Sequence, residues 1–230
     1  MKPFSLSVVI PAYNEQATVS AVFDEVKHIL DGLNVDYEII LCDDASQDST
    51  KTAIEKIVAA HPAARGIYHA ANKGLFATFE ELYHSATKEF VLLLPGDGQW
   101  AADFLPQAIT QTANCDVVII GRRQKQYPLW RKANSWLFNH LVQWCTGVDL
   151  YDIGSVKIVR REIFERVQVA THSAFTEAER LLKARKLGYR ITVFWHGHKA
   201  RGAGKASGAS LTKSLKAFGD LLNFCKTYKR

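Results

Sequence analysis

Short, almost uninterrupted apolar runs alternate with longer helical patterns along the first half of the chain. They predict five strands, at Leu6–Ile10, Tyr37–Cys42, Gly66–His69, Phe90–Leu94 and Val117–Ile120. Helical patterns separate these runs, near Gln16–Leu30, Ser49–Ala60, Gly74–Ala86 and Asp103–Ala113. Continuous apolar runs are typical of strands that are covered on both faces, as in a parallel sheet. Strand–helix alternation therefore predicts a doubly wound α/β fold.

The composition favours one large globular domain. The chain has 230 residues, and 47% of them are hydrophobic, which is enough to build a substantial core. Its four cysteines are widely spaced and form no metal-binding or redox pattern, as expected in a reducing compartment. No leader-like segment is seen, and the apolar runs are far shorter than the roughly 20 residues that span a bilayer. We therefore expect a cytoplasmic protein.

Positive charge is concentrated in the last part of the chain. Residues 199–230 contain eight Lys or Arg and one acid, hence +7, so the rest of the chain, whose total is +6, carries −1. A basic tail on a near-neutral body suggests an anionic partner, such as a membrane surface or a phosphorylated substrate. We expect no nucleic-acid partner, because the sequence contains no recognised nucleic-acid-binding module.

We divide the chain into a catalytic domain at 1–210 and a basic amphipathic helix at 211–230. Apolar residues recur in that helix at three- and four-residue intervals: Leu211, Leu215, Phe218, Leu222 and Cys225. A basic amphipathic helix can lie in a membrane interface, which would give peripheral contact with the cytoplasmic membrane face. Packing of the same stripe on the domain core or on a second subunit is the alternative.

Polar residues follow each predicted strand. In open α/β sheets ligands bind at the carboxyl ends of the strands, so these residues are expected to converge on one rim. The segments are Pro11–Glu15, Asp43–Thr50, Asn72–Gly74, Pro95–Gln99 and Gly121–Arg123. The dinucleotide-binding and P-loop glycine patterns are missing, which argues against a dehydrogenase or a P-loop NTPase.

The order of these segments resembles a known family. Val8–Glu15, Asp43–Thr50, Asn72–Gly74 and Gly96–Gln99 are similar to the successive motifs of GT-A-fold family 2 glycosyltransferases. Later segments resemble the dolichyl-phosphate mannose synthase and polyprenyl-phosphate glycosyltransferase branch: Arg131–Asn134, Asp152–Lys157, Glu179, Ala184–Tyr189 and Arg201–Gly204. The resemblance implies a GT-A (Rossmann-like), mostly parallel sheet flanked by helices, and a transferase with a nucleotide-sugar donor.

The resemblance implies roles for five donor-binding residues. Pro11, Tyr13 and Glu15 would form the wall around base and ribose. Asp44 would accept a hydrogen bond from a ring N–H, and Lys73 would meet the diphosphate at a helix N-terminus. The structural alternatives are a turn that contains Pro11 and Tyr13, an acidic residue in a first helical turn, and a solvated lysine.

The resemblance also implies a divalent cation, Mg²⁺ or Mn²⁺. Family members usually carry Asp-x-Asp-x-Gln, whereas this chain has Pro95 in place of the first acid and retains Asp97 and Gln99 as oxygen donors. Mg²⁺ commonly uses one or two carboxylates together with substrate phosphates, so a site with Asp97, Gln99 and diphosphate is feasible. A turn-forming role of Asp97 in Pro-Gly-Asp-Gly is the alternative.

The acceptor is expected to be a lipid phosphate. A phosphate nucleophile is already an anion and needs cationic clamps, a role that suits Arg122, Arg131 and Arg201 beside Asp97. A sugar-hydroxyl acceptor would need a carboxylate base instead. Four further residues would bind or orient the acceptor: Asp152, Ser155, Glu179 and Lys205. Asp152 and Glu179 are the candidates for a base.

The expected reaction is an inverting transfer from a nucleotide-diphosphate sugar to a polyprenyl (dolichyl-type) phosphate. Two alternatives stay open: transfer to a sugar hydroxyl in polysaccharide or glycolipid synthesis, and a non-catalytic nucleotide-sugar-binding subunit. The second alternative is motivated by Pro95. A membrane-protein partner is a further hypothesis for a chain that would act on a lipid.

Overall fold

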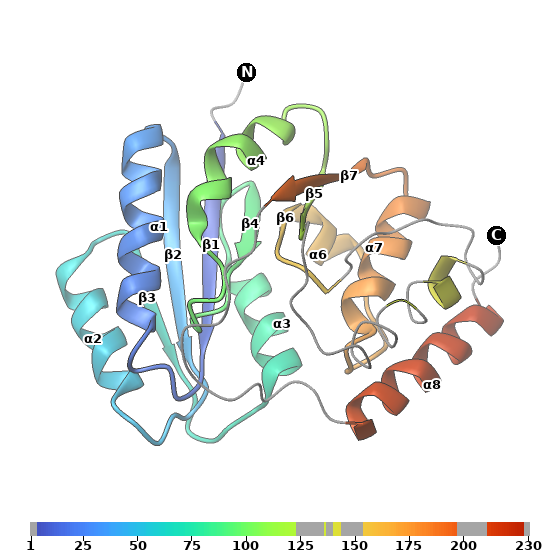
Figure 1. Ribbon diagram of the computed structural model, residues 1–230, viewed down its shortest axis with the longest axis horizontal. Helices are drawn as coiled ribbons and strands as arrows, with labels where there is room; N and C mark the ends of the chain where they lie inside the picture. Colours follow the sequence, from blue (N-terminus) through green and yellow to red (C-terminus); the bar gives the residue numbers. More distant parts are fainter. Residues whose placement is uncertain (1–3, 123–135, 137–139, 144–153, 197–210, 228–230) are drawn as a thin grey trace.

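A computed structural model describes residues 4–122, 136, 140–143, 154–196 and 211–227. Within these residues the chain forms one seven-stranded sheet in the order β3-β2-β1-β4-β6-β5-β7, with helices on both faces (Figure 1). The strands are β1 (Ser5–Ala12), β2 (Asp36–Asp43), β3 (Ala64–Tyr68), β4 (Phe90–Leu93), β5 (Val117–Arg122), β6 (Lys157–Arg160) and β7 (Ile191–His196). The predicted α/β fold with a mostly parallel sheet is confirmed.

The helices follow the strands in the order that a doubly wound domain requires. They are α1 (Val19–Leu33), α2 (Thr50–Ala60), α3 (Leu75–Ser85), a 3₁₀ turn η1 (Ala102–Phe104), α4 (Leu105–Gln111), α6 (Glu162–Arg166), α7 (Thr176–Lys186) and α8 (Leu211–Thr227). Each connection from β1 to β4 contains a helix, as parallel neighbours require.

Alternate residues of the central strands divide the core into two layers. Val8 and Ile10 of β1 point into a cluster with α1, α2 and α4, whereas Val9 points into a cluster with α3, α6 and α7. This alternation follows from the two-residue side-chain period of a strand. Because both sides of a strand are buried, the runs read as continuous apolar sequence, and this explains why the pattern predicts a parallel sheet.

One strand departs from the parallel arrangement. β6 runs antiparallel to both of its neighbours, with Ile158 opposite Leu92 of β4 and Val118 of β5. The apolar pattern does not predict β6, because it is only four residues long and both of its ends, Lys157 and Arg160, are basic. Its first residue therefore lies beside the carboxyl ends of β4 and β5, and this brings the segment 154–157 to the same edge as the predicted site.

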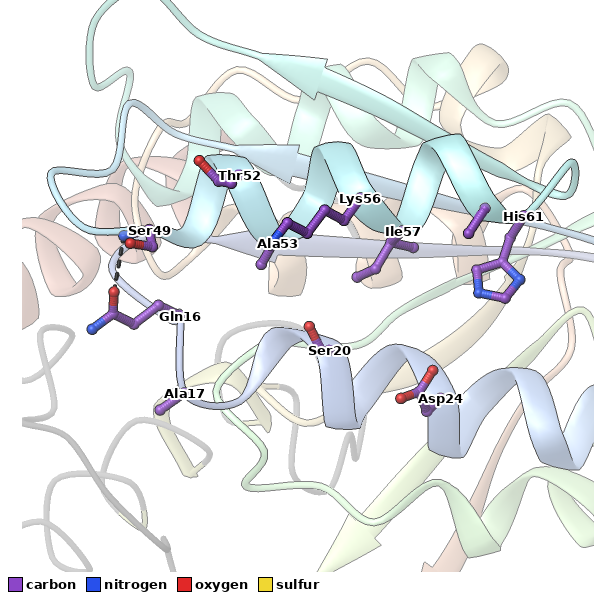
Figure 2. A pocket seen from close by; sticks show the side chains of 11 residues that line it. Gln16, Ala17, Ser20, Asp24, Ser49, Thr52, Ala53, Lys56, Ile57 and His61 are labelled. Atoms are coloured by element: carbon purple, nitrogen blue, oxygen red, sulfur yellow. Dashed lines mark hydrogen bonds between the residues drawn. The ribbon is translucent and has the colours of Figure 1, made fainter.

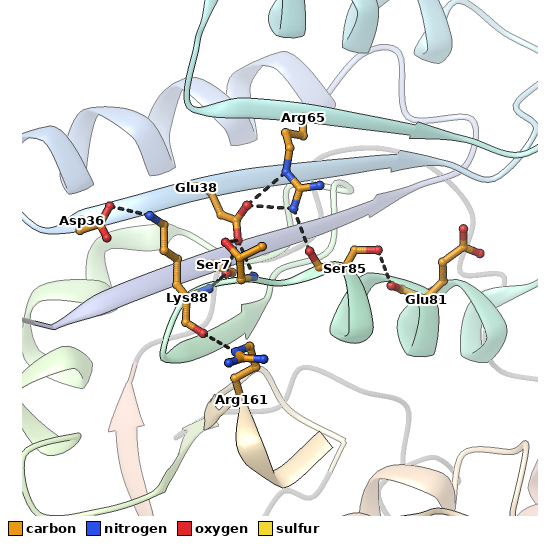
Figure 3. A network of polar contacts seen from close by, with 9 residues as sticks. Ser7, Asp36, Glu38, Arg65, Glu81, Ser85, Lys88 and Arg161 are labelled. Atoms are coloured by element: carbon orange, nitrogen blue, oxygen red, sulfur yellow. Dashed lines mark hydrogen bonds and ion pairs between the residues drawn. The ribbon is translucent and has the colours of Figure 1, made fainter. Parts of the chain in front are cut away.

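The opposite edge of the sheet is held by a buried carboxylate (Figure 3). Glu38 accepts hydrogen bonds from the Ser7 hydroxyl at 2.7 Å, from the amide and hydroxyl of Thr87 at 2.7 and 2.8 Å, and from Arg65 at 2.9 Å. Burial raises the pKa of Glu38, but these donors outweigh it and the net shift is downward. The contacts join β1, β2, β3 and the start of β4 at the edge remote from the predicted site.

The C-terminal helix α8 packs against the domain. Ala217 and Leu221 are buried in the same cluster as α7, and Phe224 lies 5.3 Å from Phe175, measured between ring centroids. One side of the helix therefore contributes to the core, which was the packing alternative for this segment. Leu222 is 53% exposed, so an apolar residue also faces outward. Among the described residues, no helix has the length and apolar character needed to cross a bilayer.

Candidate active site

The strand order reverses between β1 and β4. β2 and β3 extend the sheet on one side of β1, whereas β4 pairs with its other side. At such a reversal the loops diverge and leave a crevice beyond the carboxyl ends of the strands, where α/β domains bind ligands. The loops after β1 and β4, which carry Tyr13, Glu15 and Asp97, flank this point in the fold.

Hydrogen bonds join the loop after β1 to the loop after β2. The amide of Asn14 donates to the Ser46 hydroxyl at 2.9 Å, and the amide of Gln47 donates to Asn14 Oδ1 at 2.8 Å. The amide of Glu15 donates to Thr50 Oγ1 at 2.8 Å. Each loop thus satisfies polar groups of the other, so the rim is formed by the protein itself.

Asp48 takes part in this connection. Its Oδ1 accepts a hydrogen bond at 2.9 Å from the amide of Thr50, the first residue of α2, and its Oδ2 accepts one from the amide of Gln16 at 3.3 Å. The hydrogen bonds from Thr50 and Gln16 outweigh the effect of burial and lower the pKa of Asp48. Asp48 therefore stabilises the start of a helix and the loop facing it.

Two residues of these loops have left-handed backbone conformations. Asn14 has φ = 56° and Ala45 has φ = 58°. Asparagine adopts this conformation readily, but for alanine it costs roughly 1–2 kcal/mol. Ala45 directly follows Asp44, so the unfavourable turn places the chain where Ser46 can meet Asn14. Such strain is found more often at binding sites than elsewhere.

The three residues predicted to surround base and ribose differ in exposure. Pro11 is buried, and its carbonyl accepts a hydrogen bond at 3.1 Å from the amide of Gly96 in the loop after β4. Tyr13 is 42% exposed on the rim. The Glu15 carboxylate accepts a hydrogen bond from Thr18 at 3.2 Å. Of the three side chains, that of Tyr13 is the most available to pack against a planar ligand.

Asp44 and Lys73 lie together, as their predicted roles require. Asp44 accepts hydrogen bonds from the amides of Lys73, at 2.8 Å, and Gly74, at 3.0 Å, just before α3 begins. The Lys73 ammonium pairs with Glu81 at 2.6 Å and is 47% exposed. Only 7% of the Asp44 side chain is exposed. Since a carboxylate can accept about four hydrogen bonds, Asp44 retains acceptor capacity beyond the contacts to this loop.

Asp97 and Gln99 meet in a tight turn after β4. The backbone amide of Gln99 donates to Asp97 Oδ1 at 3.0 Å, and the side-chain amide of Gln99 donates to Oδ2. Gly98, between them, has φ = 67°, which suits glycine. Both predicted metal ligands are therefore in contact, and Asp97 and Gln99 are half-buried.

Carboxylates and imidazoles do not cluster further around this turn. Among the described residues there is no group of three or more His, Cys, Asp or Glu arranged to hold a metal ion. The ring of His196, considered as an additional ligand because it ends a strand, lies 3.0 Å from the Asp103 carboxylate. Any cation at Asp97 would therefore take most of its ligands from substrate and water.

Two residues predicted to bind or orient the acceptor have internal partners. The Ser155 hydroxyl donates to the carbonyl of Ile120 on β5 and is buried. Glu179 is 1% exposed and accepts hydrogen bonds from the Thr171 amide and hydroxyl at 3.0 and 2.7 Å, and from Lys183 at 2.6 Å. These donors outweigh burial, and they lower the pKa of Glu179. Both residues connect segments of the domain.

The remaining predicted residues are only partly accessible to description. Arg122 is the last residue of β5 and pairs with His196 of β7 in the strand register, so its backbone lies at the carboxyl edge. Arg131, Asp152, Arg201 and Lys205 lie outside the described residues. Their roles stay predictions.

The sequence analysis missed a cluster of charged side chains behind the rim. His69, at the end of β3, lies 2.6 Å from Asp44 and 3.1 Å from Glu81. Lys157 is buried and pairs with Glu177 at 2.8 Å. Position was the available signal for His69, since it directly follows β3 at the carboxyl edge; for Lys157 the pairing with β4 and β5 is a tertiary feature that no local pattern shows.

A groove of about 670 Å³ lies between α1 and α2 (Figure 2). At one end the amide of Ser49 donates to Gln16 Oε1 at 2.9 Å, and helix residues such as Ser20, Asp24 and Lys56 line the rest. None of the predicted donor-binding residues lines this groove. The crevice at the strand reversal is therefore the better candidate for the nucleotide.

The fold and this edge define an α/β domain with a nucleotide-binding rim. Residues 7–168 match the model of the family described as Glycosyl transferase family 2. That match covers more than half of the chain, and the chain belongs to this family. The family resemblance seen in the sequence is confirmed.

Several curated relatives carry names of lipid-phosphate sugar transferases. The chain is 33% identical over 163 residues to an undecaprenyl-phosphate 4-deoxy-4-formamido-L-arabinose transferase of Aeromonas hydrophila, covering 70% of this chain and 50% of that protein. It is 25% identical to a dolichol-phosphate mannosyltransferase of Pyrococcus furiosus, covering 92% and 62%. The chain thus spans about half to three fifths of the length of these relatives.

Solved structures share the fold. The crystal structure of glucosyl-3-phosphoglycerate synthase from Mycobacterium tuberculosis, in complex with Mn²⁺, UDP and phosphoglyceric acid, superposes with a TM-score of 0.74. The similarity covers 96% of this chain and 78% of that one at 21% sequence identity. The GT-A fold expected from the sequence is confirmed.

Proposed function

We propose that this chain transfers a sugar from a nucleotide-diphosphate donor to a polyprenyl phosphate, with inversion at the anomeric carbon. The observation that carries the proposal is the rim at the strand reversal, where the loops after β1 and β2 are joined to each other and the Asp97 turn is joined to β1. Membership of glycosyl transferase family 2 and the printed names of the relatives support it.

The donor would lie across this rim. Tyr13 is exposed and would pack against the base, while Pro11 and Glu15 complete the wall around base and ribose. Asp44 would accept a hydrogen bond from a ring N–H. Lys73 precedes α3 and carries a half-exposed ammonium, and it would bind the diphosphate once its pair with Glu81 opens.

The donor set fits a divalent cation. Asp97 offers a half-buried carboxylate and Gln99 an amide oxygen, both hard oxygen donors of the kind that Mg²⁺ and Mn²⁺ bind. A cation held by these residues and the diphosphate would neutralise charge on the leaving group. The structural relatives that contain Mn²⁺ or Mg²⁺ with UDP support this assignment by fold only, at 20–22% identity.

A phosphate acceptor suits the carboxylates of this site better than a hydroxyl acceptor does. An acceptor hydroxyl needs a base with a carboxylate open to it. Glu179, one of the two candidates, is 1% exposed and already accepts several hydrogen bonds. A phosphate monoester attacks as an anion, and Arg122, whose backbone lies at the carboxyl edge, would hold it together with Arg131 and Arg201.

The reaction balances without a proton acceptor. An oxygen of the lipid phosphate forms a bond to the anomeric carbon on the face opposite the diphosphate, whose bond to that carbon breaks and whose oxygen keeps the electron pair. Lys73, and Arg122 together with the other arginines, would stabilise the two anions from opposite sides of the sugar. Ser155 and Glu179 would act indirectly, by supporting the segments that carry the acceptor site, and Asp152 and Lys205 would bind or orient the acceptor.

We also propose that α8 brings the site to an anionic membrane surface. The buried side of α8, with Ala217 and Leu221, holds it on the domain, and outside that side lie exposed Leu222, Lys216 and Lys226. Basic residues beside apolar ones favour the surface of an anionic bilayer. A membrane-protein partner is the alternative occupant. Cosedimentation with vesicles that contain anionic lipid tests this, with Lys216→Glu and Lys226→Glu expected to lower binding several-fold.

The transfer itself is tested with GDP-, UDP- and dTDP-sugars, Mn²⁺ and a short polyprenyl phosphate, with product detected by mass spectrometry. The proposal expects one lipid-phosphate sugar product, which is lost in Asp97→Asn. Product with the dephosphorylated polyprenol or with an oligosaccharide, and none with the phosphate, would favour the hydroxyl-acceptor alternative. Nucleotide binding without any product would favour the non-catalytic subunit.

A further inference from the structure

His69 lies between two carboxylates behind the nucleotide rim. Its Nδ1 is 2.6 Å from Asp44 Oδ1 and its Nε2 is 3.1 Å from Glu81 Oε2. The imidazole side chain is 2% exposed, so water does not compete effectively for these contacts. Because one ring nitrogen faces each acid, the imidazole connects the residue at the end of β2 to helix α3.

Lys73 closes this connection into a ring of contacts. Its backbone amide donates to Asp44 Oδ1 at 2.8 Å, the same oxygen that faces His69. Its ammonium donates to Glu81 Oε2 at 2.6 Å, the same oxygen that faces the other ring nitrogen. The two proposed donor-binding residues are therefore connected twice, once through the backbone of Lys73 and once through His69 and Glu81.

Other groups around the imidazole do not provide an alternative partner of equal strength. From β2, the buried Cys42 thiol lies 3.5 Å from Nε2, and burial raises the pKa of this thiol to about 12, so it stays neutral. The Lys73 hydrogen bond is the main cause that lowers the pKa of Glu81, so this acid is ionised where it faces the ring. The strong contacts of His69 are those with Asp44 and Glu81.

We propose that His69 is a positioning residue that couples base recognition by Asp44 to diphosphate recognition by Lys73. This inference rests on the proposed donor roles of those two residues. When a diphosphate takes the Lys73 ammonium, Glu81 loses its cation and keeps the His69 ring as its buried partner. The ring then binds Glu81 more strongly while still fixing Asp44, so occupancy of the phosphate end is transmitted to the base end.

The coupling can be measured in the free protein, without a nucleotide. The ring nitrogens of His69 give ¹⁵N NMR signals that respond to the charge next to Nε2. Lys73→Met is expected to shift the Nε2 signal, and Lys51→Met, which removes an exposed lysine on α2, is the matched control and should leave it unchanged. In a Glu81→Gln background the effect of Lys73→Met should largely disappear. Equal His69 signals in wild type and Lys73→Met would overturn the coupling.

Nucleotide binding gives the second readout. The expected pattern with the bound nucleotide is that Lys73→Met weakens the diphosphate but leaves the nucleoside monophosphate unchanged, whereas His69→Gln weakens both by about fivefold or more. In the His69→Gln background the effect of Lys73→Met on the diphosphate should shrink. Fully additive effects would contradict the coupling, and Glu81→Gln provides the same test if His69→Gln does not fold.

The two hypotheses fail in different ways. If the wild-type protein binds none of GDP, UDP and dTDP with Mn²⁺, the proposed function fails, while the ring signals still decide whether Lys73 and His69 are coupled. If nucleotides bind and the His69 signals ignore Lys73, the proposed function stands and the coupling is wrong.

Discussion

The side chain of Gln99 donates to Asp97, so the two predicted metal ligands already meet in the absence of a donor. The turn that joins them is fixed by Gly98 and by the hydrogen bond from the Gly96 amide to the Pro11 carbonyl. Pro95 stands at the start of this turn, where family members usually carry an additional acid. A carboxylate could enter there without rebuilding the loop, because the turn depends on Gly96 and Gly98.

We predict that Pro95→Asp raises the affinity for Mn²⁺ in the presence of the bound nucleoside diphosphate by roughly an order of magnitude, because ligand charge count tunes affinity for divalent cations. Titration with Mn²⁺ followed by electron paramagnetic resonance measures it. Pro95→Asn is the matched control, since it also removes the proline but adds no charge. Equal affinity in the two variants would show that position 95 does not reach the cation.

We predict that Glu38→Gln lowers the free energy of unfolding by about 1–3 kcal/mol, because a charged acceptor of several buried donors is lost. The folded-state pKa of Glu38 is depressed, so its contribution is present above the unfolded-state value and is lost as the pH falls through the folded-state pKa. The difference between wild type and variant should therefore shrink in acid. Urea denaturation at pH 7 and pH 3.5 tests this, and a difference that grows in acid would contradict it.

We predict that Ala45→Gly stabilises the protein by about 0.5–1 kcal/mol, because glycine adopts φ = 58° without the steric cost that alanine has. Ala59→Gly, at an exposed position of helix α2, is the control and should destabilise by a similar amount. Thermal unfolding measures both. Destabilisation by Ala45→Gly would mean that the backbone of this loop is not strained.

We predict that Thr18→Val costs about 1 kcal/mol and raises the KM for the donor more than it changes kcat. The Thr18 hydroxyl donates to the Gly96 carbonyl at 2.7 Å and thereby joins the first turn of α1 to the loop that carries Asp97. Thr110→Val removes an exposed hydroxyl that donates within α4 and should change neither KM nor stability appreciably. An unchanged donor KM in Thr18→Val would show that this contact does not position the Asp97 turn.

Much of the fold follows from local patterns. Each predicted strand overlaps an observed one, and β1, for example, contains the whole run Leu6–Ile10. The helix predicted near Gln16 begins at Val19, because the amides of Asn14, Glu15 and Gln16 bond across to the loop after β2. Such bonds depend on the pairing of two segments more than 30 residues apart, which no periodicity encodes.

The site was predictable where residues follow their own strand. Asp44, Lys73 and Asp97 reach the predicted edge because parallel strands place their carboxyl ends together. What could not be predicted is how the carboxylates are used. Glu179 is occupied by a loop eight to nine residues earlier, and Asp44 is held by His69, contacts that depend on tertiary packing. The division of the chain at residue 210 stays a prediction.

Binding of a nucleoside diphosphate is the most direct test of the central claim. Isothermal titration with GDP, UDP and dTDP, each with and without Mn²⁺, should show one nucleotide that binds in a metal-dependent manner, and Asp97→Asn should remove the metal dependence while leaving a weaker, metal-independent affinity. If none of the three nucleotides binds with or without Mn²⁺, the rim at the strand reversal is not a donor site and the account is wrong.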